Sequence, residues 1–338
     1  MNLQSPILLR RLVYGAILGI LVYALFALLT DATVLFHHLR SVPWFVVAVA
    51  CLLSLTNYAL RFFRWHAYLR LLGLDVPVGR SLVIFLAGLL MAISPGKVGE
   101  VIKSALLKRS DDLPIARTAP IVFAERLTDL FGLFILAAVG VVFFQYGVVA
   151  FIISAAAVLS VLLFLQFPSA VHRVLDIIEG LPLVGAHRPS LDRAYKATQT
   201  LLQWRPLAMA TGLGTLGWAM EALAFMWILV HLGASAPVVL EAFFVFSVST
   251  LAGALSFLPG GLGVTEAGMT GLLLWLEIFD DLGPSLAATY LIRFTTLWFG
   301  VVVGLLSFLL YEWLQRRAND DMDTGGRGGD STAQTDLS

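Results

Sequence analysis

Charged residues are scarce in this sequence, and their scarcity limits the classes of protein that it can encode. Lys and Arg number 22 and Asp and Glu number 22 in 338 residues, so only 13% of the chain is charged, against about 25% in a soluble domain. Hydrophobic residues make up 59%, and the mean hydropathy is +0.88. The composition excludes an ordinary soluble domain and predicts an all-α integral membrane protein.

Cysteine and metal-binding patterns are nearly absent as well. Cys51 is the single cysteine, which excludes an internal disulfide and a thiolate metal cluster. The six histidines are scattered, without the spacing of a metal site. The formal net charge of zero gives no indication of nucleic-acid binding. We therefore expect no enzymatic activity, no cofactor, no metal site and no nucleic-acid partner.

Long apolar runs predict six membrane spans, since a helix needs about 20 apolar residues to cross a bilayer. They lie at about 12–29, 43–63, 118–146, 148–167, 206–232 and 284–314. Two further apolar segments, at about 81–94 and 238–258, run into Pro-Gly breaks followed by a second short helix-like stretch. Lipid cannot satisfy the backbone groups that such breaks set free. We therefore expect two re-entrant or broken-helix hairpins around an internal site.

The backbone of these hairpins recurs within a longer internal repeat. Leu72-Gly73 and Pro77-Val78 reappear 160 positions later as Leu232-Gly233 and Pro237-Val238. The break residues Pro95, Gly96 and Gly99 correspond to Pro259, Gly260 and Gly263, with Gly261 beside them. Arg126, Thr128 and Leu130 correspond to Arg293, Thr295 and Leu297. The order span, hairpin, span thus occurs twice, as in transporters built from inverted repeats; chance similarity between apolar segments is the alternative.

These patterns divide the chain into a membrane domain at 1–314 and a tail at 315–338. Repeat one covers about 43–146 and repeat two about 206–314, and a span with a basic loop at 148–205 connects them. The tail is rich in Gly, Ser, Thr and Asp and is expected to be disordered.

The basic residues predict the orientation in the membrane. If the N-terminus is cytoplasmic and each hairpin returns to its own side, all Lys and Arg except Arg40, Arg126 and Arg293 fall on the cytoplasmic side. The positive-inside rule favours this topology, with both termini cytoplasmic in a multi-pass cell membrane protein. In this arrangement the two hairpins enter from opposite sides, so the repeats are inverted.

Charged residues in or beside apolar segments are the candidate site, because a charge at the bilayer centre costs at least about 2.5–3.5 kcal/mol. The candidates are Arg61, Arg64, Lys97, Glu100, Lys103, Glu125, Arg126, Asp129, Glu266 and Arg293. Simpler readings exist for several of them. Lys97, Glu100 and Lys103 could be solvated loop charges, and Glu125, Arg126 and Asp129 could form a structural ion pair. Glu266 could merely complement a helix dipole.

Some polar and aromatic residues near the ends of spans suggest interfacial roles. Arg64 can snorkel to the membrane surface. The residues that look like interfacial anchors are Trp44, Trp204, Tyr311 and Trp313.

The sequence resembles the lysylphosphatidylglycerol synthase transmembrane-region family, also known as flippase-like or UPF0104 proteins. The matching motifs are Arg61-x-x-Arg64-Trp65, Pro95-Gly-x-x-Gly-Glu100, Glu125-Arg126-x-x-Asp129 and Pro259-Gly-Gly-x-Gly-x-x-Glu266. The resemblance implies movement of a polar lipid headgroup between leaflets. It implies membrane lipids as partners, and lipid-biosynthetic enzymes as further candidates. No aminoacyl-transferase segment is evident, so we do not expect lysyl-lipid synthesis.

The leading hypothesis is therefore a lipid flippase or lipid-linked substrate transporter. A non-transporting accessory subunit of a lipid or cell-envelope glycan complex is the first alternative, and an embedded glycosyl- or acyltransferase is the second. The sequence leaves the oligomeric state open.

The topology can be tested by cysteine labelling in a Cys51→Ala background. Ser235→Cys should react with a membrane-impermeant thiol reagent in intact cells, because its loop is predicted to be external. Ser190→Cys and Ser331→Cys should react only after the cells are opened. Labelling of Ser190→Cys in intact cells would contradict the predicted orientation.

Overall fold

The computed structural model describes residues 38–94, 99–144, 188–234 and 238–327, with isolated positions between 152 and 173. Within these ranges the chain is helical and contains no strand. The elements are α3 (Trp44–Leu71), α4 (Val78–Leu89), η1 (Leu90–Ile93), α5 (Ile102–Asp111), α6 (Ile115–Phe144), α9 (Arg188–Leu201), α10 (Trp204–His231), α11 (Val239–Leu255), η4 (Pro259–Gly261), α12 (Val264–Trp275), α13 (Leu282–Arg293), η5 (Phe294–Trp298) and α14 (Phe299–Arg327). The predicted spans at 12–29 and 148–167 lie outside the described residues.

Three helical segments in the described residues are long and apolar enough to cross a membrane. They are Trp44–Leu71, Trp204–His231 and Leu282–Arg317. Val78–Ile93 and Val239–Leu255 are apolar but shorter. The structure thus agrees with a helical membrane protein, while the number of spans stays a prediction.

The same order of elements occurs twice. A 28-residue helix, α3 or α10, leads to a short helix, α4 or α11. A break, a second short helix (α5 or α12) and a long terminal helical segment follow. The turns after α3 and α10 each contain a glycine with positive φ, Gly73 at 66° and Gly233 at 94°. The two glycines are one of the sequence correspondences, so the equivalence extends to backbone conformation.

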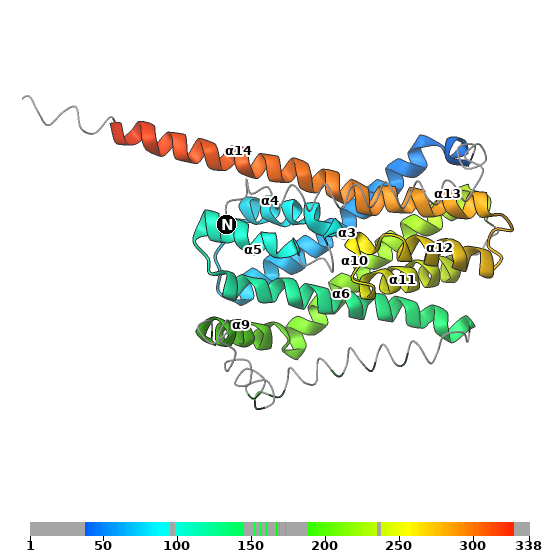
Figure 1. Ribbon diagram of the computed structural model, residues 1–338, viewed down its shortest axis with the longest axis horizontal. Coiled ribbons are helices and arrows are strands. Elements are labelled where there is room, and N and C mark those ends of the chain that lie inside the picture. Colours follow the sequence, from blue (N-terminus) through cyan, green and yellow to red (C-terminus); the bar gives the residue numbers. More distant parts are fainter. Residues whose placement is uncertain are drawn as a thin grey trace, which may run out of the picture.

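The two halves pack reciprocally. The helices α3 and α10 pack against each other at the centre, α4 packs against α14 of the other half, and α11 packs against α6. Figure 1 shows α4 and α5 towards one end of the bundle and α11 and α12 towards the other, between α14 and α6. Each half therefore supplies the long helix that covers the short helix of the other.

The helix breaks have identifiable backbone causes. In the second half Gly260, Gly261 and Gly263 all have positive φ, a conformation that glycine adopts without steric cost.

Between α13 and α14 the chain forms one π-helical turn, η5, so these helices are nearly continuous. The helix α14 runs on to Arg327, past the predicted end of the membrane domain at 314.

The predicted interfacial anchors divide into two groups. Trp44, Trp204 and Trp313 are exposed on the surface of the bundle. Tyr311 is buried, and its hydroxyl donates a hydrogen bond to the Leu106 carbonyl oxygen at 3.0 Å. The anchor prediction was wrong for Tyr311, because α14 turns this side chain inward against α5.

We predict that Gly304→Ala will destabilise the bundle. A methyl group there would meet the backbone of Leu89 and Leu90, where α14 crosses the end of α4. Overpacking of this kind costs about 1–3 kcal/mol. Gly271→Ala is the matched control, because its methyl group would enter open space. Thermal unfolding in detergent should show a lower midpoint for Gly304→Ala alone; equal midpoints would contradict the close packing.

Candidate functional site

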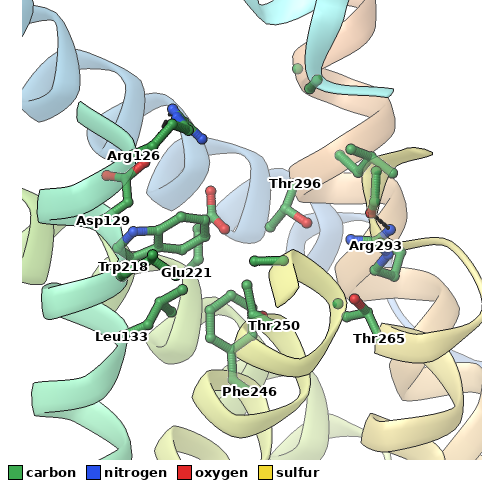
Figure 2. Close-up of a pocket in the computed structure, with 18 of the residues that line it drawn as sticks. Arg126, Asp129, Leu133, Trp218, Glu221, Phe246, Thr250, Thr265, Arg293 and Thr296 are labelled. Atoms are coloured by element: carbon green, nitrogen blue, oxygen red, sulfur yellow. Dashed lines mark hydrogen bonds and ion pairs between the residues drawn. The ribbon is translucent and has the colours of Figure 1, made fainter. Parts of the chain in front are cut away.

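A cavity of about 250 Å³ lies between the two halves of the bundle. Elements of both halves line it, and its wall is mainly apolar, with contributions from Leu130, Leu133 and Phe246. The charged residues in its wall are Arg61, Arg126, Asp129, Glu221 and Arg293. Figure 2 shows Arg126 and Asp129 on one side of the cavity and Arg293 on the other, with Glu221 between them. The cavity thus combines an apolar lining with a few polar groups, as ligand sites do.

Asp129 organises the first side of the cavity. Its carboxylate contacts the Nη2 atoms of Arg64 at 2.7 Å, Arg126 at 3.1 Å and Arg61 at 3.4 Å. Arg64 is fully buried and also donates a hydrogen bond to Thr128 Oγ1 at 3.1 Å. Removing these charges from water costs several kcal/mol for each ion, which their mutual pairing offsets. The snorkelling alternative for Arg64 is therefore wrong, because its guanidinium points into the bundle.

Glu100 extends this cluster towards α5. Its Oε2 atom accepts a hydrogen bond from Arg126 Nη2 at 2.9 Å and lies 3.8 Å from Lys103 Nζ. Lys103 Nζ in turn donates to Glu125 Oε2 at 2.5 Å. Seven predicted site residues thus form one buried charge network, which consists of Arg61, Arg64, Glu100, Lys103, Glu125, Arg126 and Asp129.

The second half carries a related pair. Arg293 Nε donates to Glu266 Oε1 at 2.7 Å, and Arg293 Nη2 donates to the Gly260 carbonyl oxygen at 2.7 Å. Glu266 Oε2 accepts a hydrogen bond from the Gly263 backbone N–H at 2.8 Å, which caps the start of α12. Glu266 therefore both caps a helix and fixes Arg293. The pair Glu266–Arg293 corresponds to Glu100–Arg126 in the first half.

The correspondence extends to other residues around the cavity. The Thr128 hydroxyl donates to the carbonyl four residues earlier at 2.8 Å, and Thr295 does so at 3.0 Å. At the repeat offset of 160 positions, Arg61 on α3 matches Glu221 on α10. Both residues line the cavity, so equivalent positions present opposite charges to the same space.

Not every predicted site residue reaches the cavity. The members of the charge network that do not line the cavity wall are Arg64, Glu100, Lys103 and Glu125. Glu266 is also absent from the wall. Lys97 lies outside the described residues, as do the break residues Pro95 and Gly96. The described part of the first break is held by Ser94, whose hydroxyl accepts a hydrogen bond from the Gly99 N–H at 2.9 Å.

The cavity wall contains residues outside the predicted set, including Tyr58, Trp218 and Glu221. Tyr58 donates its hydroxyl to the Thr296 carbonyl oxygen at 2.7 Å, and Trp218 lies against the Arg61 guanidinium, 5.8 Å from ring centre to Cζ. Glu221 accepts a short hydrogen bond from the Asn57 amide. Tyr58 and Trp218 are also separated by the repeat offset, so the repeat was the signal that could have identified them.

The site contains buried arginine N–H groups that suit the binding of an anion. No group of three or more His, Cys, Asp or Glu side chains with the geometry of a metal site occurs among the described residues. The Nε–H groups of Arg61 and Arg126 are buried and have no hydrogen-bond partner in the described part of the chain. Arginine donates in a planar arrangement that matches phosphate and carboxylate oxygens.

Comparisons with known proteins identify the family of the chain. The family model of the lysylphosphatidylglycerol synthase TM region matches residues 16–304. A UPF0104 membrane protein from Methanothermobacter thermautotrophicus (strain Delta H) is 26% identical over 293 residues, which cover 78% of this chain and 82% of that protein. The family match at residues 16–304 includes every residue of the cavity wall and ends within α14.

We predict that Asp129→Asn will strongly destabilise the protein. The substitution leaves three guanidinium groups buried together without their shared carboxylate, and breaking a buried ion pair costs about 3–5 kcal/mol. Asp111→Asn is the control, because its pair with Arg80 is partly exposed and should contribute less than about 1 kcal/mol. Thermal unfolding in detergent compares the two. Equal unfolding midpoints would show that Asp129 does not hold the network together.

Proposed function

Because the chain belongs to the lysylphosphatidylglycerol synthase transmembrane-region family, we propose that it moves lipids with an anionic headgroup between membrane leaflets. The substrate would be a phospholipid or a lipid-linked glycan, whose phosphate is the group that the site recognises. The proposal involves movement only and no bond-making chemistry.

The observation that carries the proposal is the charged cavity between the two halves of the bundle. Three of the five charged residues in its wall are arginines, namely Arg61, Arg126 and Arg293. Charged side chains within membrane segments commonly mark the path of a substrate. An apolar wall with inward-facing guanidinium groups suits a lipid, because the acyl chains can stay in the apolar surroundings while the phosphate pairs with arginine.

Arg126 is the first cation that an entering headgroup would meet. Its side chain is 21% exposed, whereas those of Arg61 and Arg293 are 8% and 9% exposed. It bridges Glu100 and Asp129, and its Nε–H has no hydrogen-bond partner in the described residues. A headgroup phosphate could therefore accept a hydrogen bond from Arg126 without breaking both existing ion pairs.

The reciprocal packing supports alternating access as the mechanism. Each short helix, α4 or α11, lies on the long helix of the other half, and the cavity lies between the halves. Rocking of one half against the other would open the cavity to one leaflet and then to the other, as in transporters with inverted repeats. The inverted orientation, the two hairpins and the cytoplasmic termini belong to this proposal. We place the protein in the cell membrane on the same grounds.

Substitution of Arg126 tests the proposal. We expect Arg126→Gln to lower lipid exchange between leaflets by about tenfold or more for each folded molecule, because a hydrogen bond from a charged group contributes about 1.5–3 kcal/mol. The measurement uses purified protein in liposomes with a fluorescent anionic phospholipid, whose outer-leaflet label is chemically quenched. Size-exclusion profiles in detergent give the folded fraction.

Arg109→Gln is the matched control. Arg109 pairs with Glu312 at 2.5 Å, is 41% exposed, and does not line the cavity. Wild-type exchange in Arg126→Gln would remove Arg126 from the substrate path. Exchange by the wild-type protein no faster than in empty vesicles would contradict transport and favour an accessory role in a biosynthetic complex.

A further inference from the structure

The fully buried ion pair Lys103–Glu125 lies behind the cavity wall, and the proposed headgroup site does not use it. Lys103 Nζ and Glu125 Oε2 are 2.5 Å apart, with side chains 2% and 0% exposed. The ammonium group lies over the Trp65 ring, 4.5 Å from its centroid, and 5.3 Å from that of Phe85. Neither member of the pair lines the cavity. The pair is therefore withdrawn from water, between the aromatic rings and the rest of the charge network, and an ionised group is costly in such a position.

The carboxylate of Glu125 is only half satisfied. Its Oε2 atom binds Lys103, but its Oε1 atom is buried and has no hydrogen-bond partner in the described residues. An unsatisfied buried oxygen of a charged group loses its hydration without compensation. The Oε1 atom is therefore the position at which this buried carboxylate has unused hydrogen-bonding capacity.

The second half of the protein has apolar residues where the first half has this pair. In the alignment of the repeats, Lys103 corresponds to Met269 and Glu125 corresponds to Ile292. Both replacements are buried, at 1% and 0% exposure. The neighbouring Glu–Arg pair is kept in both halves, whereas the Lys–Glu pair occurs in the first half alone. Apolar replacement of a buried ion pair is often neutral or stabilising, so the retained pair points to a role other than stability.

We propose that Glu125 is a proton-binding site that couples proton uptake to anion binding in the cavity, an inference that rests on the proposed lipid transport. A continuous set of contacts connects the two. Lys103 lies 3.8 Å from Glu100, and Glu100 binds Arg126 at 2.9 Å at the cavity wall. A proton on Glu125 weakens its hold on Lys103 and lets the ammonium group pair with Glu100. Arg126 is then less strongly bound by Glu100 and is available to the headgroup.

The charges around Glu125 determine the direction of this coupling. The charge network supplies Arg61 and Arg64 on α3, Glu100 just before α5, Lys103 on α5, and Arg126 and Asp129 on α6. Buried titratable groups of the helices packed against α6 include Tyr58 and Tyr68 on α3, Tyr195 on α9 and Glu221 on α10. The charged residues of α9 whose side chains are described, Asp192, Arg193 and Lys196, are exposed or half-buried. The only charged residue of α11 is Glu241, in its first turn. An anion bound at Arg126 adds negative charge to this group and favours a proton on Glu125. By linkage, a proton on Glu125 favours the anion to the same extent.

The test uses the same liposomes, with a pH gradient of one unit imposed across the membrane. If one proton is coupled to each lipid, this gradient can shift the leaflet ratio of a fluorescent phosphatidylglycerol by up to about tenfold. We expect the wild-type protein to shift the ratio severalfold and to reverse the shift when the gradient is reversed. Glu125→Gln should exchange lipid at rates that are the same with and without the gradient.

Two further variants make the result independent of any folding defect in Glu125→Gln. The double variant Lys103→Met/Glu125→Ile reproduces the residues of the second half and should fold, as judged by size exclusion, yet show no response to the gradient. Glu312→Gln removes a surface carboxylate that pairs with Arg109 and should keep the wild-type response.

Three outcomes would overturn the inference. A wild-type response in a folded Glu125→Gln or in the double variant would exclude Glu125 as the coupled site. If the wild-type protein exchanges lipid but the leaflet ratio is the same with and without the gradient, proton coupling is excluded and the proposed function stays intact. Absence of any exchange by the wild-type protein would contradict the proposed function and the inference with it.

Discussion

The geometry of the cavity depends on the shared carboxylate of Asp129. This side chain contacts three guanidinium groups, two from α3 and one from its own helix. Three buried cations this close would otherwise repel one another in a medium of low dielectric constant. Asp129 therefore joins α3 to α6 at this point. It also decides which arginines face the cavity, because Arg64 is held behind the wall while Arg61 and Arg126 stay in it.

The two halves share a backbone plan but differ in the chemistry placed on it. The turn glycines, the threonines bonded to their own helix and the Glu–Arg pairs recur in both halves. In contrast, the first half places Arg61 at the cavity, whereas the second half places Glu221 there at the equivalent position. Elements that recur are the ones that hold helix ends and helix breaks together. The residues that differ carry the charge asymmetry of the site, which an exactly repeated sequence could not provide.

The sequence located several of the described helices, and it named Arg61, Arg126, Asp129 and Arg293 of the charged residues that line the cavity, but it did not predict α9. Apolar runs and Pro-Gly breaks located α3, α6, α10 and both interrupted segments, because span length and backbone breaks are local properties. The contacts that each side chain makes with neighbouring helices were much harder to predict. The sequence did not indicate that Tyr311 faces α5, that Arg64 turns inward to Asp129, or that Trp218 lies against Arg61. Such contacts join helices far apart in the chain, and helical periodicity in a segment that is apolar on all sides does not identify the inward face.

The reciprocal covering of α4 by α14 and of α11 by α6 has a consequence for biosynthesis. The helix α4 is made early, but the helix that covers it is among the last elements to leave the ribosome. During that interval the face of α4 towards α14 must be covered by lipid or by another protein. The cavity is also incomplete until Arg293 and η5 arrive. A chain that ends before α13 contains all seven residues of the charge network but lacks Arg293 and η5, which form part of the cavity wall.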